Sequence, residues 1–165
     1  MLSVRGSREL RAAVLAVRTA RREVRNDIAR ATRQTMNPVW RDLVASRART
    51  ALDRRVLDTG VRVAAGNPPA LVAAGSRRRL PGGLTPAEDW QPVEFGADPD
   101  TVTTYTRRSP SGGTHQVRRH TTRQLPARRP KGRVVYPAVA QIAPRLASLW
   151  VQLIVRKFSD AVEGR

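Results

Sequence analysis

Apolar residues recur at steps of three and four positions over residues 7–36 of the chain. No glycine or proline interrupts this pattern, so it predicts one helix over 7–36 with Ser7 as its N-cap. A helix of about 30 residues is about 45 Å long, more than a small domain can cover. We therefore expect part of its apolar stripe to pack on a neighbouring subunit; the alternative is a helix lying on its own sheet. The stripe expected to mediate self-association consists of Leu10, Val14, Val17, Val24 and Ile28.

A second helix is predicted directly after the first. Asn37 is a good N-cap and Pro38 suits a first helical position, and apolar residues continue the helical spacing to Leu57. Thr59 and Gly60 then form a turn that ends the helix. We thus expect residues 1–57 to be helical.

Residues 58–136 are predicted to be rich in β-structure. Val61 and Val63 lie in one short strand and residues 70–74 in another, with a loop-rich stretch over 76–100. Residues 101–125 read as a hairpin: Thr101–Arg108 and Val117–Leu125 alternate, and Ser109–Gly113 form the turn between them. Because an isolated hairpin is marginal in water, this one should lean on another subunit or protrude as an arm.

The last part of the chain is predicted to be a packing helix. Val134–Tyr136 read as a short strand, after which Pro137 opens a helix over 137–165 with a wide apolar face. Pro144 should lie at a kink or in a first turn, because an interior proline costs about 3 kcal/mol. The fold class is therefore α+β in one domain, 1–165: a long N-terminal helix, a small antiparallel sheet with a protruding basic hairpin, and a C-terminal packing helix.

Composition narrows the possible functions. The chain has 165 residues, 31 Lys and Arg against 13 Asp and Glu, a net charge of +18, and no cysteine. Disulfide scaffolds, thiol catalysis and thiolate zinc sites are thereby excluded. No signal-type stretch follows Met1, and the most apolar run, 146–155, is shorter than the roughly 20 residues of a spanning helix. We therefore expect an intracellularly made protein without a membrane partner.

Positive charge is concentrated in residues 101–135, which hold nine basic residues and no acidic one. Such a segment fits an anionic partner, either an acidic protein surface or a nucleic-acid backbone. A non-catalytic DNA-binding role for 101–133 is the alternative function, although Tyr105 is the only aromatic residue there and base stacking is poorly served. The expected contact residues are Arg107, Arg108, Arg118, Arg119, Arg123, Arg128, Arg129 and Lys131.

No catalytic or cofactor-binding pattern is present. His115 and His120 lie on the cationic hairpin without the carboxylate that orients a general base, and no glycine-rich phosphate loop occurs. Glu88, Asp89 and Glu94 are close in sequence around Trp90, but their spacing matches no calcium loop. We therefore expect no enzyme, no cofactor and no metal site.

Three short motifs occur in an order that resembles a family of tailed-phage neck proteins. They are Asp58-Thr59-Gly60, Val93-Glu94-Phe95-Gly96 and Tyr136-Pro137-Ala138, behind a long charged N-terminal helix. The resemblance is to the tail-completion proteins encoded between the capsid and tail-tube genes. The hairpin over 101–125, inserted between the second and third motifs, departs from it. The resemblance makes Thr59, Gly60, Glu94, Phe95, Gly96, Pro137 and Ala138 fold determinants, with Glu94 expected to pair with an arginine.

The function implied by this resemblance is structural. Such proteins lie at the head–tail junction of the virion, assembled in the bacterial host cytoplasm, and form a ring, often of six copies, on the particle axis. Their partners are adaptor and stopper proteins on the head side and the tail terminator or tail tube on the tail side. Genome DNA in the channel is a further partner, which the basic hairpin would meet if it does not meet protein.

Overall fold

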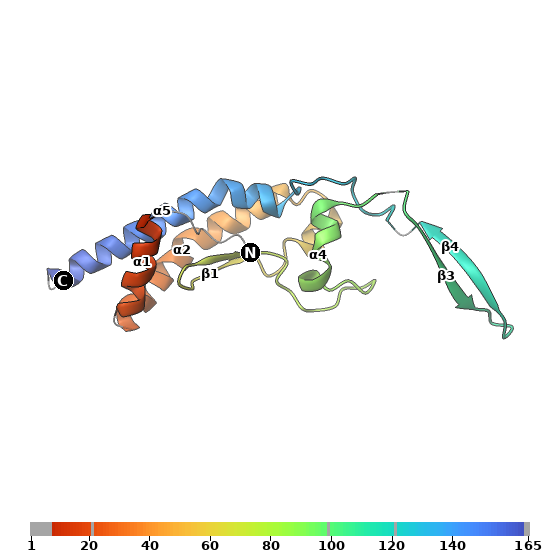
Figure 1. The fold of residues 1–165 in the computed structure, drawn as a ribbon, viewed down its shortest axis with the longest axis horizontal. Coiled ribbons are helices and arrows are strands. Elements are labelled where there is room, and N and C mark those ends of the chain that lie inside the picture. Colours follow the sequence, from red (N-terminus) through yellow and green to blue (C-terminus); the bar gives the residue numbers. More distant parts are fainter. Residues whose placement is uncertain (1–7, 21, 99, 121, 164–165) are drawn as a thin grey trace.

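A computed structural model describes residues 8–20, 22–98, 100–120 and 122–163 of the chain; the predicted N-cap Ser7 lies outside them. The fold is mixed α+β, as predicted, with two small antiparallel sheets, β1–β2 and β3–β4 (Figure 1). The elements, in chain order, are α1 Arg8–Thr19, α2 Arg22–Arg47, α3 Ala51–Val56, β1 Arg62–Ala64, β2 Ala70–Val72, α4 Pro86–Phe95, β3 Val102–Arg108, β4 Thr114–His120 and α5 Val135–Val162.

The predicted single helix over 7–36 is wrong, because the chain bends between α1 and α2. The hydroxyl of Thr19 donates to the carbonyl oxygen of Ala16 at 3.0 Å, a local bond of the kind that competes with helix continuation. The bend turns α1 across α5 (Figure 1), and apolar residues of the two helices pack together. Tertiary packing, rather than a glycine or proline, accounts for the break.

The predicted helix start at Asn37-Pro38 is also wrong, because α2 runs through both residues. The Asn37 side chain is not an N-cap; its Oδ1 accepts a hydrogen bond from the backbone N–H of Val63 at 2.6 Å. Three residues later, Trp40 Nε1 donates to the carbonyl oxygen of Val72 at 2.9 Å. These two bonds fasten α2 to β1 and β2, and this anchoring offsets the cost of an interior proline.

The main hydrophobic core lies between α2, α5 and the first sheet. Trp40, Val44 and Ile142 are fully buried in it, together with Val63 from β1 and Val93 from α4. The sheet consists of two three-residue strands, with Val63 opposite Leu71. Both predicted strands of this region are thus confirmed, and they pair with each other.

A second apolar cluster covers the N-terminal stripe. Leu10, Val17 and Ile28 are buried against Trp150 and Ile154 of α5, and Val14 and Val24 pack around them. The expectation that this stripe is left for a neighbouring subunit is therefore wrong. The same chain covers it, because α1 folds back onto α5 instead of extending α2.

The predicted second helix over 37–57 is not continuous, because α2 ends at Arg47 and α3 begins at Ala51. It is replaced by the end of α2 and by the short helix α3, which begins with a capping box: Thr50 Oγ1 accepts from Asp53 N–H and Asp53 Oδ2 accepts from Thr50 N–H, both at 3.0 Å. The turn after it is as predicted. The Thr59 hydroxyl donates to the carbonyl oxygen of Val56, and Gly60 has a φ of 65°, which favours glycine.

The loop predicted over 76–100 contains a helix, α4. Thr85 precedes it, Pro86 lies in its first turn, and the Asp89 carboxylate accepts from the Thr85 N–H at 2.7 Å. The helix was not predicted because it contains two prolines, Pro86 and Pro92, which are typical of loops. Asp89 has non-helical backbone angles at a kink in the helix.

The predicted strand over 134–136 is likewise wrong, since α5 begins at Val135 and runs through Pro144. Among the described helices, α5 is the one with the length and apolar composition to cross a membrane, over Val135–Asp160. The ten-residue limit expected for the apolar segment is therefore too short. Core helices meet the same two criteria, and here α5 packs on both α1 and α2. The absence of a membrane partner stays a prediction.

Candidate cationic interface

The basic hairpin is an arm at the end of the molecule opposite to the C-terminal end of α5 (Figure 1). Its strands pair antiparallel in the register that sets Tyr105 opposite Val117. Within β3 and β4 only Val102 and Val117 are half-buried; all other residues are exposed. The predicted hairpin is confirmed, although β4 begins and ends earlier than the expected strand 117–125. Since so little of it is buried, the arm gains little stability from apolar packing.

The register divides the arginines equally between the two faces of the arm. Residues directly opposite each other share a face, as do residues two positions apart. The pairs Arg107–His115 and Thr103–Arg119 therefore share a face with Tyr105, which is 41% exposed between them. Arg108 and Arg118 lie on the other face, with His120 opposite Val102. Both faces thus present two arginines and one histidine, and no acidic side chain.

The linker after the arm is hydrogen-bonded to the end of α4. Ala97 N–H donates to the carbonyl oxygen of Pro126 at 3.0 Å, and Arg129 N–H donates to that of Phe95 at 2.6 Å. Gly96 lies between these bonds with a φ of 72°, and a Cβ there would overlap the backbone of Ala127. A glycine is therefore required at this crossing. The side chains of Arg123, Arg128, Arg129 and Lys131 are exposed along this route.

Arg133, the last basic residue of the cationic segment, forms an internal ion pair. Its Nη2 lies 2.7 Å and 2.8 Å from the two carboxylate oxygens of Asp53, and Asp53 is buried. Asp53 is not among the residues expected from the sequence to have a role. Its signal was the Thr50-x-x-Asp53 capping pattern, which marks a helix start but not the distant arginine.

The prediction that Glu94 pairs with an arginine side chain is wrong, because Glu94 instead caps the start of α5. Its fully buried carboxylate accepts hydrogen bonds from the backbone N–H groups of four consecutive residues that open α5, Arg133 to Tyr136, at 3.0–3.2 Å. A helix N-terminus carries unpaired N–H groups and partial positive charge, so a carboxylate there is stabilised without a cationic partner. A Cβ at Gly132, whose φ is 73°, would overlap this carboxylate.

The remaining motif residues meet around this cap. Phe95 packs against Tyr136 with ring centroids 5.0 Å apart, and Trp90 stacks on the same tyrosine at 6.4 Å. Pro137 lies in the first turn of α5, where a proline is tolerated, and Ala138 is fully buried. The second and third motifs are therefore in direct contact.

The histidine and acidic residues considered for catalysis or metal binding lie apart from one another in the structure. His115 and His120 lie on opposite faces of the arm. Of the acidic residues near Trp90, Asp89 accepts a hydrogen bond at the start of α4, whereas Glu94 caps the start of α5. Within the part of the chain that the structure describes, no three His, Asp or Glu side chains come together as a metal site requires.

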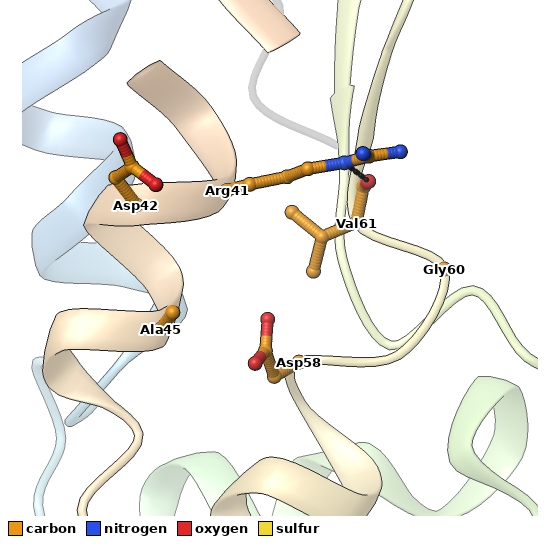
Figure 2. Close-up of a pocket in the computed structure, with 6 residues that line it drawn as sticks. All are labelled: Arg41, Asp42, Ala45, Asp58, Gly60 and Val61. Carbon is orange, nitrogen blue, oxygen red and sulfur yellow. Dashed lines mark hydrogen bonds between the residues drawn. The ribbon is translucent and has the colours of Figure 1, made fainter. Parts of the chain in front are cut away.

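A cavity of about 380 Å³ lies between α2 and the chain that leads into β1. Figure 2 shows Arg41 reaching across it to the carbonyl oxygen of Val61, to which its Nε donates at 3.2 Å, while Asp58 points into the space below. Desolvation by burial raises the pKa of Asp58 above its ordinary value of 3.8. The folded state therefore holds this proton more tightly than the unfolded chain does. The resulting stability is present at low pH and is lost as the pH rises through the raised pKa.

We predict that Asp58→Asn raises the melting temperature at pH 7, where the wild-type carboxylate is charged, and has little effect near pH 3, where the carboxyl group is neutral in both states. Calorimetry across this pH range measures both. Asp42→Asn is the matched control, because Asp42 lines the same cavity with an exposed side chain and the net charge changes equally. An equal rise for both variants at pH 7 would show that net charge, rather than burial of Asp58, sets the effect.

Comparison with known proteins leaves the family open. No protein-family model, no curated protein and no solved structure matches the chain, so the likeness to phage neck proteins rests on the three motifs.

Proposed function

We propose that this protein is a non-enzymatic structural protein of the head–tail junction of a tailed phage, and that its arm holds it on an acidic surface of a neighbouring junction protein. The observation that carries the proposal is the arm itself. It is two seven-residue strands with four arginines, no acidic residue and almost no buried side chain. Such a ribbon contributes little to its own fold and is suited to contact with another molecule.

The contact between the second and third motifs supports the resemblance on which this proposal draws. Glu94 bonds to the Tyr136 N–H at 3.0 Å, and Phe95 packs on the Tyr136 ring. Residues that are distant in the sequence therefore act together, as the cap and the start of one helix. The motifs thus have a shared structural reason to occur in one chain.

The proposed assembly is a ring of identical copies, six in number, on the particle axis. The head-side partners are adaptor and stopper proteins, and the tail-side partners are the tail terminator or tail tube. Because α5 covers the N-terminal stripe, that stripe offers no support for the ring. The proposal relies instead on the arm, and a polar arm that reaches a neighbour is compatible with a ring of closed symmetry.

The test is complementation of a phage whose copy of this gene is disrupted. We expect Arg118→Glu with Arg119→Glu to lower the titre at least tenfold and to remove the protein from purified particles, since both faces of the arm then repel an acidic partner. Arg77→Glu with Arg78→Glu is the matched control, two adjacent exposed arginines in a loop of the body. Wild-type titre with the arm variant, or absence of the wild-type protein from particles, would contradict the proposal.

Binding of a nucleic-acid backbone is the second candidate function. The equal distribution of arginines on both faces favours it, because a phosphate backbone then meets positive charge whichever face it approaches. Titrating the same two variants and the wild type with duplex DNA at several salt concentrations separates the candidates. Steeply salt-dependent binding lost in the arm variant alone supports DNA, and no binding by the wild type at low salt removes this candidate.

A further inference from the structure

A cleft of about 730 Å³ lies beside the linker that follows the arm, and none of its lining residues belongs to β3 or β4. The end of α2 forms one wall, the turn before α3 forms another, and the linker at Pro126 and Ala127 closes it. This volume is in the range of sites that take small-molecule ligands. The polar residues that line it are Ser46, Arg47, Arg49, Thr50, Arg129 and Arg133.

Four arginines from two segments, 46–50 and 126–133, converge on this cleft. The carboxylate bonded to one of them is Asp53, which is buried and engaged with Arg133. Four positive charges against one negative charge leave an excess of three on the cleft. A single carboxylate would offset only part of this excess. A free phosphate group or pyrophosphate carries about two or more negative charges, and a nucleic-acid backbone supplies one with every phosphodiester, so several of its phosphates offset the excess together.

Two of the arginines are held in place before any ligand arrives. Arg133 is fixed by Asp53, its side chain only 13% exposed, and Arg47 Nη2 donates to Gln141 Oε1 at 2.8 Å. Each uses one terminal nitrogen for this bond, which leaves other guanidinium N–H groups for an acceptor. Among the described residues, the guanidinium groups of Arg49 and Arg129 have no partner, and both side chains are exposed at the cleft. Fixed and free arginines together suit bidentate binding of phosphate oxygens.

We propose that this cleft is a binding site for a phosphate-bearing ligand, with Arg47 and Arg133 as its fixed donors and Arg49 and Arg129 as the side chains that close on the ligand. The phosphate comes either from a free anion or from the phosphodiester backbone of a nucleic acid. The site does not depend on the proposed function, because it uses none of the arginines on the two strands of the arm.

The test is isothermal titration of the full chain with pyrophosphate and, in a second arm, with a single-stranded hexanucleotide. We expect Arg49→Gln with Arg129→Gln to weaken binding by roughly a factor of ten or more, because each lost charge-assisted hydrogen bond corresponds to about one order of magnitude in affinity. Arg107→Gln with Arg118→Gln is the matched control, since it removes the same charge from the arm. Both variants alter exposed side chains, and circular dichroism verifies that they fold.

Binding of pyrophosphate that is lost in the cleft variant and kept in the arm variant supports a free-anion site. The same pattern with the hexanucleotide alone supports the phosphodiester. Equal weakening by both variants would overturn the proposal, because diffuse positive charge would then explain the binding. The proposal would also fail if neither probe binds the wild type. It would fail as well if oligoglutamate binds as tightly as pyrophosphate with the same dependence on Arg49 and Arg129, because the site would then be one for acidic protein segments.

Discussion

Replacing Glu94 by glutamine should lower the free energy of unfolding by about 2–4 kcal/mol. The wild-type carboxylate is fully buried and accepts hydrogen bonds from the backbone N–H groups of four consecutive residues at the start of α5. Glutamine keeps one acceptor oxygen and turns an NH₂ group toward donors, so at least one backbone N–H is left buried without an acceptor. It also removes the negative charge that the helix N-terminus stabilises.

Urea unfolding at pH 7 measures this loss as a lower transition midpoint. Glu88→Gln is the matched control: it lies in the same helix α4, its side chain is exposed, and the charge change is identical. We expect the control to change stability by no more than about 0.5 kcal/mol. Equal midpoints for Glu94→Gln and the wild type would show that the cap does not hold α5, and the contact between the two motifs would lose its structural meaning.

Local sequence rules succeeded where a segment depends mainly on its own residues. The hairpin over 101–125 follows from alternating Thr and Val and from a glycine-containing turn, and its strands pair as expected. The apolar face of α5 was visible from the spacing of Ile142, Leu146 and Trp150. In these elements the periodic pattern and the final packing agree, so a sequence reading is enough.

The same rules failed where distant contacts decide. The Asn37 side chain accepts a hydrogen bond from Val63, and this contact helps α2 to continue through Pro38. The packing of α1 on α5 breaks the helix between α1 and α2, although no glycine or proline lies there. The roles of Asp53 and Glu94 depend on Arg133 and the start of α5, about 80 and 40 residues further along the chain. No local pattern carries such information. The cationic cleft was missed for the same reason, since Arg47 and Arg129 meet only after folding.

Replacing Trp150 by alanine should release α1 from the rest of the molecule. Trp150 is 2% exposed and is the largest side chain of the cluster that buries Leu10, Val17 and Ile28. Removing a buried tryptophan costs about 3–5 kcal/mol. Because this cluster is separate from the main core, we expect the loss to appear as local opening of α1. Amide exchange in 8–19 should accelerate by roughly a hundredfold or more, while exchange in β1 stays close to the wild-type rate.

The matched control is Val155→Ala, which alters an exposed residue of the same helix and should leave exchange in α1 unchanged. Once α1 opens, the apolar stripe is free, so the variant should also form concentration-dependent oligomers that the control does not form. Unchanged exchange in 8–19 would show that Trp150 does not hold α1. Equal acceleration in α1 and β1 would show that the two clusters unfold as one unit. If α1 opens and the exposed stripe then drives association, it follows that α5 keeps this surface covered in the wild-type chain. A ring of copies then has to form through other surfaces, and the arm is the first of these to test.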